Sequence, residues 1–173
     1  MGHRILIADD HPAIRKVLRA LIESHGGWEV CGEAENGFAA LGKVTELKPD
    51  LVILDLAMPV MDGIRAAREI SSVMPELPIL MHTMHGSPAV NLEAKKAGVT
   101  KVIGKGESGE NLVGAIEELL KMASARSTAE GHSVKPEAVT TTASAAEAAT
   151  TASEKPNDGS GATPDGEESS EPN

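Results

Sequence analysis

The stretch that decides the fold runs from Leu51 to Gly63 and reads LVILDLAMPVMDG. Its first four residues form an uninterrupted β-prone apolar run, which is typical of a strand covered on both faces. Strands of that kind belong to parallel sheets, and open parallel sheets bind ligands at the carboxyl ends of their strands. Asp55 comes directly after the run and is therefore predicted to lie in that crevice. On this stretch alone, Asp55 could equally be a turn residue that caps the next segment.

Three other apolar runs also end in polar side chains. Residues 4–8 are followed by Asp9 and Asp10, residues 78–82 lead to Thr83, and residues 99–103 lead to Lys105. The carboxyl ends of parallel strands meet at one edge of a sheet. The sequence therefore predicts that three carboxylates, a hydroxyl and an ammonium group gather at that edge.

Helical patterns alternate with these strands. Pro12 suits a first helical turn, and apolar residues then recur at i, i+3, i+4, i+7 and i+8. Comparable patterns occur in residues 38–47, 64–70, 88–97 and 109–123, and residues 28–33 read as a strand near a sheet edge. The fourth helix has the weakest apolar face. Five strands and five helices in alternation predict a doubly wound parallel α/β sheet, flavodoxin-like, with strand order 2-1-3-4-5.

The composition changes sharply near Arg126. Of the acidic and basic residues, 9 and 2 follow Arg126, a net charge of −7, while 17 and 14 lie within residues 1–126, a net charge of −3. The later part is rich in Ala, Thr, Ser, Glu, Gly and Pro and cannot bury enough apolar surface to offset its ordering entropy. We therefore expect a globular domain over residues 1–126 and a disordered acidic tail over residues 127–173.

Composition also narrows the partners and the location. An acidic chain without a basic block has no electrostatic footprint for nucleic acid or anionic membrane, so direct DNA binding is not expected. No apolar run reaches membrane-spanning length, and no signal-peptide layout precedes the first strand. The single cysteine, Cys31, excludes an internal disulfide and fits a reducing compartment. A cytoplasmic protein with protein or small-anion partners is the expectation.

The predicted cluster has the chemistry of phosphoryl transfer. The carboxylates of Asp9, Asp10 and Asp55 suit a hard divalent cation, and Mg²⁺ favours a few carboxylates together with waters and a phosphate oxygen. A carboxylate beside Mg²⁺ can act as a nucleophile toward phosphorus and yield an aspartyl phosphate. Lys105 would neutralise a phosphoryl oxygen and Thr83 would hydrogen-bond another. A transition-metal centre at the nearby residues His11, His82 and His85 is disfavoured, because the oxygen set already suffices for Mg²⁺.

With these marks in order, residues 4 to about 122 resemble the receiver domain of two-component response regulators. The marks are Asp9-Asp10 after the first strand, the motif D-x-x-M-P-x-x-D-G from Asp55 to Gly63, Thr83 and Lys105. The runs 10–12 and 83–85 resemble the NarL/FixJ type. Members of that type usually continue into a helix-turn-helix DNA-binding domain, which this sequence is expected to lack.

The resemblance implies a role for each matching residue. Asp55 would be the phosphoacceptor, and Asp10 and Asp55 would bind the metal directly. Asp9 would bind the metal through water, and the backbone carbonyl of Ala57 would be the remaining metal ligand from the protein. Thr83 would be the switch hydroxyl and Lys105 the cation that pairs with the phosphoryl group.

Two departures from the family concern how the signal is read. Val102, three residues before Lys105, stands where the family usually has Tyr or Phe, so the usual inward swing of an aromatic ring is not available. Gly106 replaces the proline that often follows the lysine, and Gly104 adds another flexible point to the same loop. Signal readout is therefore expected to differ in detail from that of the family.

The leading functional hypothesis is a single-domain response regulator. Asp55 would take a phosphoryl group, with Mg²⁺, from a histidine kinase or phosphotransfer protein. The output would be binding of a downstream protein, passage of phosphate along a relay, or a homodimer formed on phosphorylation. Such a protein is a phosphoacceptor with weak self-phosphorylation and autodephosphorylation rather than an enzyme. The alternative is a docking module that acts without phosphorylation. A Mg²⁺ phosphohydrolase is remote, because Ala57 occupies the place where such enzymes want a second acid.

Overall fold

A computed structural model of the chain describes residues 2–84 and 86–130. The predicted boundary after Arg126 falls inside the last helix, whose backbone continues to Glu130. The segment 131–173, which makes up most of the predicted disordered tail, and His85 lie outside the described residues. Residues 127–130, the first four of the predicted tail, are therefore helical.

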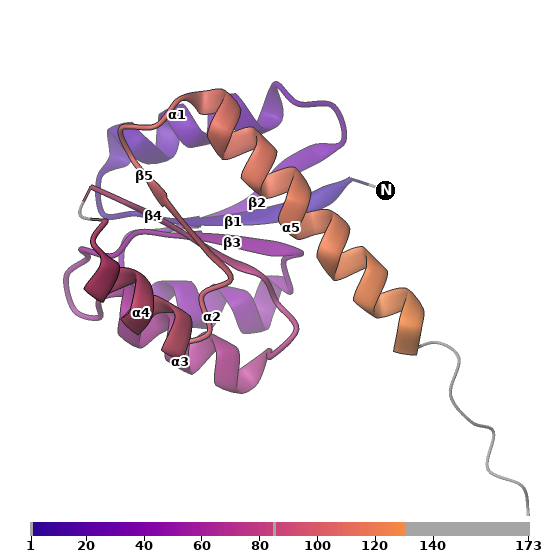
Figure 1. Cartoon of the computed structure of the whole chain (residues 1–173). Helices are drawn as coiled ribbons and strands as arrows, with labels where there is room; N and C mark the ends of the chain where they lie inside the picture. Colours follow the sequence, from indigo (N-terminus) through magenta and orange to yellow (C-terminus); the bar gives the residue numbers. More distant parts are fainter. Residues whose placement is uncertain (1, 85, 131–173) are drawn as a thin grey trace, which may run out of the picture. The chain divides into compact units, whose positions relative to one another are not determined.

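The sheet has five parallel strands, in the order β2-β1-β3-β4-β5 (Figure 1). This confirms the predicted flavodoxin-like topology. The edge position predicted for residues 28–33 is also correct, since β2 borders only β1. The strands are β1 His3–Ala8, β2 Trp28–Ala34, β3 Leu51–Leu54, β4 Ile79–Thr83 and β5 Lys101–Gly104.

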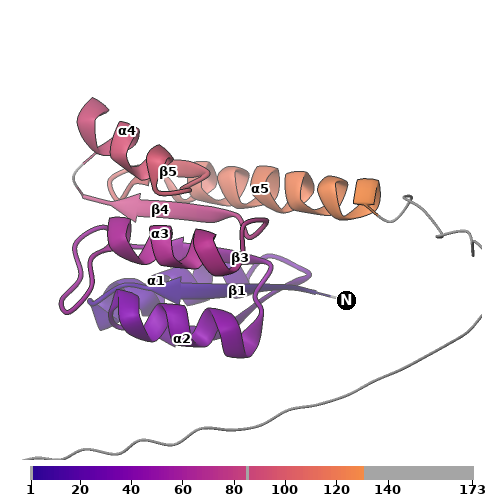
Figure 2. The same cartoon turned by 90° about the horizontal axis from the view of Figure 1, so that it is seen from below.

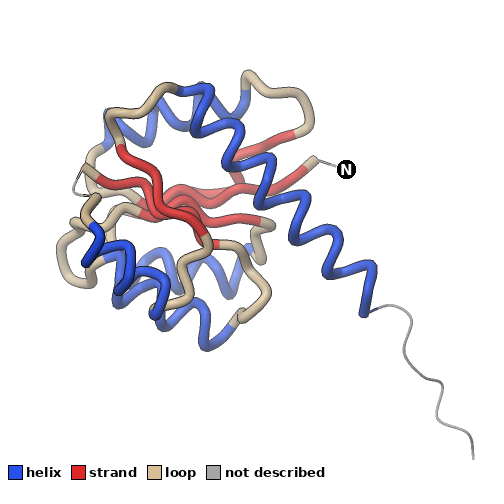
Figure 3. The backbone as a smooth tube through the Cα atoms, in the orientation of Figure 1, coloured by secondary structure: helices blue, strands red, loops and turns tan. Residues whose placement is uncertain are grey.

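Five helices cover both faces of this sheet. They are α1 Pro12–Glu23, α2 Gly37–Leu47, α3 Gly63–Val73, α4 Pro88–Lys96 and α5 Gly109–Glu130. Two views at right angles place α1 and α5 on one face and α2, α3 and α4 on the other (Figures 1 and 2). The sheet therefore forms the middle layer of three (Figure 3).

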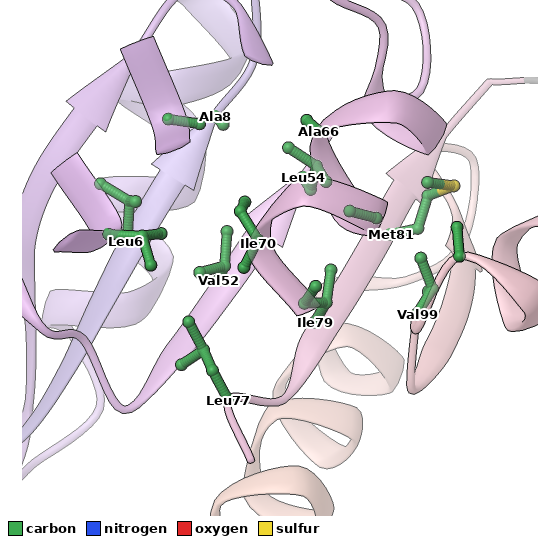
Figure 4. Close-up of a cluster of buried hydrophobic side chains, with 14 of the residues drawn as sticks. Leu6, Ala8, Val52, Leu54, Ala66, Ile70, Leu77, Ile79, Met81 and Val99 are labelled. Atoms are coloured by element: carbon green, nitrogen blue, oxygen red, sulfur yellow. The ribbon is translucent and has the colours of Figure 1, made fainter. Parts of the chain in front are cut away.

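The core consists of two apolar clusters, one on each face of the sheet. Because successive side chains of a strand point to opposite faces, Leu6 belongs to the cluster under α2, α3 and α4, while its neighbours Ile5 and Ile7 belong to the one under α1 and α5. Figure 4 shows the first cluster, in which residues of β1, β3 and β4 meet Ile70 of α3. Helix α4 contributes only Ala94 from within its bounds, in agreement with its weak apolar pattern.

Side-chain caps define where several helices begin. Asn36 accepts a hydrogen bond from the Ala39 amide at 2.8 Å, and Asp62 accepts one from the Arg65 amide at 2.8 Å. Ser87 accepts one from the Val90 amide at 3.2 Å, as its place before Pro88 predicts. Each bond satisfies an amide that has no partner inside its own helix.

The start of β5 differs from the sequence prediction. The apolar pattern predicts a strand from residue 99, whereas β5 begins at Lys101. The reason lies at the end of α4, where Gly98 adopts φ +92° and the Val99 amide donates to the Ala94 carbonyl at 2.9 Å. Val99 thus completes the helix cap before the chain enters the sheet.

The turn that presents Asp55 is held by backbone contacts. The Gly63 amide donates to the Leu56 carbonyl at 2.9 Å, and the Gly37 amide of α2 donates to the Met61 carbonyl at 3.0 Å. A Cβ atom on Gly63 would lie 2.1 Å from the Asp55 carbonyl oxygen. Only glycine fits there, because any side chain would displace the backbone of Asp55 itself.

None of the described helices is both long enough and apolar enough to cross a membrane.

Replacing Gly63 with alanine tests this close approach. We expect Gly63→Ala to lower the free energy of unfolding by about 2–3 kcal/mol, because the added methyl group overpacks against backbone that cannot rotate away. Gly42→Ala is the control, since a Cβ at Gly42 in α2 meets no atom within 4 Å. It should raise stability by about 0.5–1 kcal/mol through better helix propensity. Urea unfolding of both variants measures the difference, and equal effects would contradict the steric explanation.

Candidate functional site

Three residues that the sequence places at strand ends meet in an ion cluster at the carboxyl edge of the sheet. The Lys105 ammonium nitrogen lies 2.7 Å from Asp9 Oδ2 and 3.1 Å from Asp55 Oδ1. The side chains of Lys105, Asp9 and Asp55 are 6%, 2% and 4% exposed, respectively. The loops after β1, β3 and β5 therefore bring two carboxylates and one ammonium group together, almost out of contact with water.

Backbone hydrogen bonds continue the sheet past the strand ends and hold these residues in place. The Asp9 amide donates to the Ala34 carbonyl of β2 at 3.1 Å, and the Asp55 amide donates to the Ala8 carbonyl of β1 at 2.8 Å. The Lys105 amide donates to the Thr83 carbonyl of β4 at 2.8 Å. Each functional residue is thus tied through its main chain to the neighbouring strand, which fixes the positions from which the side chains start.

The burial of this cluster alters its acid–base properties. Burial raises the pKa of Asp55 above its ordinary value, and the hydrogen bond and charge of Lys105 only partly oppose that rise. Burial by itself lowers the pKa of Lys105, but the hydrogen bonds with Asp9 and Asp55 outweigh it and keep the pKa above its ordinary value. Lys105 therefore stays charged and favours the ionised form of Asp55.

Asp10 and His11 extend the acidic edge toward solvent. The His11 ring nitrogen Nδ1 lies 2.6 Å from Asp10 Oδ1, and the His11 amide donates to Asp9 Oδ1 at 2.9 Å. One ligand atom each from Asp9, Asp10 and His11 lies within 4.8 Å of the others. With Asp55 included, the three carboxylates outnumber the single ammonium by two charges, and hard oxygen donors with excess negative charge suit a divalent cation such as Mg²⁺.

The remaining predicted site residues lie on the same edge. Thr83 is buried at the end of β4, and Ala57 is exposed in the loop after Asp55. Val102, at the position where an aromatic ring is usual, is half-buried and packs against the core cluster under α2, α3 and α4. The structure therefore puts all the predicted side chains at the expected edge, and it brings Asp9, Asp55 and Lys105 into direct contact there.

Two further residues belong to this region, His82, which the sequence already places near the site, and Arg15, which it does not. His82 is 8% exposed and lies among the charges of Lys105, Asp9 and Glu107, and burial followed by Lys105 lowers its pKa. Arg15 of α1 donates from Nη1 to the Asp9 carbonyl at 2.7 Å. The sequence shows that His82 is near the site but not that it is buried beside Lys105, and an arginine within a helix carries no local pattern that would single out Arg15.

The fold and this edge define an open α/β domain with an ionic site at the carboxyl ends of its strands, and comparison with known proteins identifies its family. Residues 5–117 match the response regulator receiver domain family, and the chain belongs to this family. It is thus a receiver domain of two-component signalling, as the motifs around Asp55 predict.

Individual relatives agree with this assignment. The chain is 40% identical over 121 residues to the chemotaxis protein CheY of Thermotoga maritima, covering 70% of this chain and all of that protein. The NarL signal receiver domain of Mycobacterium tuberculosis has a TM-score of 0.67 at 30% identity, covering 69% of this chain and 97% of that one. A LuxR-family response regulator from Aurantimonas sp. SI85-9A1 has a TM-score of 0.68 at 37% identity, covering 70% and 86%.

The buried histidine leads to a pH-dependent prediction. As pH falls through about 6.5, the unfolded His82 binds a proton, whereas the folded residue resists because its pKa is lowered, so folding stability is lost in that range. His82→Leu removes this loss. We expect the difference in unfolding free energy between the variant and the wild type to shift in favour of the variant as pH falls from about 7.5 to about 5.5. Urea unfolding in metal-free buffer measures this difference.

The control for this prediction is the wild-type protein measured at each pH, so that the titration of all other groups cancels in the difference. A difference that stays constant over the range would show that His82 titrates alike in the folded and unfolded chains.

Proposed function

We propose that this protein is a response regulator that accepts a phosphoryl group on Asp55 from a histidine kinase or a phosphotransfer protein, with Mg²⁺ as cofactor. The observation that carries the proposal is the Lys105 ammonium held between Asp9 and Asp55, in a chain that belongs to the receiver family. A nucleophile, a fixed positive charge and an acidic rim are the parts that phosphoryl transfer requires.

The transfer itself needs little from the protein beyond position and charge. An oxygen of the ionised Asp55 carboxylate attacks the phosphorus of a phosphohistidine. The new O–P bond forms as the N–P bond breaks, and the leaving imidazole nitrogen keeps the electron pair and takes up a proton. Lys105, 3.1 Å from Asp55 Oδ1, favours the ionised form of the carboxylate and then faces the charge brought by the phosphoryl oxygens.

The acidic rim is the proposed site of the cation. Asp10, Asp55 and the Ala57 carbonyl would hold Mg²⁺ directly, and Asp9 would hold it through water. When bound, Mg²⁺ supplies positive charge that offsets the repulsion between the acidic edge and an incoming phosphoryl group. Asp9 also pairs with Lys105 at 2.7 Å, so this carboxylate orients the ammonium as well as contributing charge to the rim.

Phosphorylation would be reported through β4 and β5. Phosphorylation replaces the single negative charge of the Asp55 carboxylate with nearly two negative charges on the phosphoryl group. The Lys105 ammonium and the Thr83 hydroxyl are therefore drawn toward it. Their backbones are linked by the 2.8 Å bond between the Lys105 amide and the Thr83 carbonyl, so the two strand ends move together. With Val102 in place of an aromatic ring, this linked pair and the adjoining helix α4 carry the change.

The output would arise from the same surface. Displacement of the ends of β4 and β5 changes the surface around α4. The output is then binding of a downstream protein, transfer along a phosphorelay, or dimerisation on phosphorylation. The protein acts as a phosphoacceptor with slow self-phosphorylation and autodephosphorylation rather than as an enzyme. The cytoplasm, where histidine kinases present their phosphohistidine and a lone thiol such as Cys31 stays reduced, is its proposed location.

Phosphorylation by a small-molecule donor tests the acceptor directly. With acetyl phosphate and Mg²⁺, intact-protein mass spectrometry should show an adduct of one phosphoryl group on the wild-type protein and none on Asp55→Asn, because the amide is no nucleophile. Asp62→Asn is the matched control. Asp62 lies in the same loop but is exposed and caps α3 through the Arg65 amide, a bond that asparagine can also accept. An unmodified wild-type mass, or an adduct that survives in Asp55→Asn, would contradict the proposal.

A phosphate mimic separates the phosphorylation switch from the alternative of a docking module that needs no phosphate. Adding beryllofluoride and Mg²⁺ should shift the backbone amide NMR signals of Thr83 and Lys105 and those along α4. In Thr83→Ala the shift at Lys105 should remain and that along α4 should shrink, since the hydroxyl that responds to the added charge is gone. Thr45→Ala is the control, because the Thr45 hydroxyl donates to carbonyls within α2. Unmoved signals with intact binding of a partner would favour the docking module.

A further inference from the structure

We infer that Arg15 is a positioning residue of the acidic site, because it fixes the peptide group that joins Asp9 to Asp10. The inference rests on the proposed function, since it concerns how the two carboxylates are presented to a cation. Arg15 stands on α1, and its guanidinium donates to Glu33 and to the Asp9 carbonyl, so its part is to hold these groups in place.

Two hydrogen bonds hold the Arg15 guanidinium between the acidic loop and the edge strand. Its Nη1 donates to the Asp9 carbonyl oxygen at 2.7 Å, and its Nε donates to Glu33 Oε2 at 3.1 Å. The Arg15 side chain is only 16% exposed. A planar guanidinium offers its donors in a fixed fork, so occupying both acceptors fixes the direction of each bond.

Glu33 provides a rigid anchor for this arginine. Its second oxygen, Oε1, accepts a hydrogen bond from Arg19 Nε at 2.7 Å, and its main-chain carbonyl accepts one from the Lys43 ammonium of α2. The hydrogen bond from Arg19, then that from Arg15, lowers the pKa of Glu33 despite its burial. Glu33 therefore stays charged and is held from α1 and α2 while its backbone lies in β2.

The bond to the Asp9 carbonyl matters because of where that carbonyl lies. It belongs to the peptide plane between Asp9 and Asp10, the two residues whose carboxylates must point to the same cation. The preceding peptide is already fixed by the Asp9 amide, which donates to the Ala34 carbonyl at 3.1 Å. Arg15 fixes the next peptide, so together these bonds set the relative direction of the two acidic side chains. Partners one step behind metal ligands commonly change affinity by about tenfold or more when removed.

Arg19 is a natural control for Arg15. Both arginines come from α1, and both donate through Nε to a carboxylate oxygen of Glu33. The difference lies in the second partner, since Arg19 Nη1 donates to Glu23 of its own helix at 2.7 Å whereas Arg15 Nη1 donates to the Asp9 carbonyl. Loss of either arginine removes one Glu33 ion pair, but only loss of Arg15 releases the acidic loop.

The first test uses the metal-free full-length protein. The carbonyl ¹³C NMR shift of Asp9 reports whether its oxygen accepts a hydrogen bond. It should move in Arg15→Met and stay in place in Arg19→Met, while thermal unfolding shows both variants folded. An unmoved Asp9 signal in Arg15→Met would overturn the inference.

The second test measures Mg²⁺ binding by calorimetric titration of the same proteins. Arg15→Met should weaken the affinity about tenfold, and Arg19→Met should stay within about twofold of wild type. In a double-mutant cycle of Arg15→Met and Glu33→Gln, the two losses of Mg²⁺-binding free energy should be less than additive, because each substitution removes the same Arg15–Glu33 contact. Equal affinities of the two arginine variants would overturn the inference and leave the proposed function standing. A wild-type protein that binds no Mg²⁺ would overturn both.

Arg15→Lys is the second variant if Arg15→Met does not fold. Lysine keeps the charge and most of the stem, but its single nitrogen cannot occupy the Nη1 and Nε positions at once. It should weaken Mg²⁺ binding less than methionine would but measurably more than Arg19→Met. An affinity equal to wild type in Arg15→Lys would show that charge alone suffices and would overturn the positioning role.

Discussion

The buried ion cluster of Asp9, Lys105 and Asp55 is the constraint on which the rest of the structure depends. Removing two carboxylates and an ammonium from water is costly, and their attraction offsets that cost only when the geometry is held closely. Three strand ends provide that geometry, because the amides of all three residues donate to carbonyls of adjacent strands. The apolar layers on both faces hold together the strands that end at this cluster.

Most of the fold can be predicted from local patterns in the sequence. Alternation of apolar runs with helical periodicity predicts the doubly wound parallel sheet, and the chain length suits its flavodoxin-like strand order. The parallel sheet in turn brings Asp9, Asp55, Thr83 and Lys105 to one edge. The features that the sequence does not indicate depend on particular hydrogen-bond partners. The start of β5 is delayed because Val99 completes the cap of α4. The pairing of Arg15 with Glu33 joins residues 18 apart and has no local signature.

Membership of the receiver family does not by itself say how a change at the acidic site reaches the surface of each member. In this chain the aromatic position holds Val102, which packs into the core cluster and cannot act as a swinging ring. The exposed and weakly packed helix α4 lies next in sequence to Thr83, so a small displacement of β4 meets little resistance there. A weakly packed helix that shifts easily can thus take the place of a side-chain rotation in transmitting the change from the site.

The turn after Asp55 has a consequence for how such proteins diversify. Its shape depends on backbone contacts, above all the approach of Gly63 to the Asp55 carbonyl, while the side chains of Ala57 and Val60 are exposed to solvent, and Val60 adopts a left-handed φ of +67°. The backbone contacts that frame the loop therefore do not involve the side chains of Ala57 and Val60. Evolution can exchange those groups to tune how long a phosphoryl group survives, or which donor fits, without rebuilding the site.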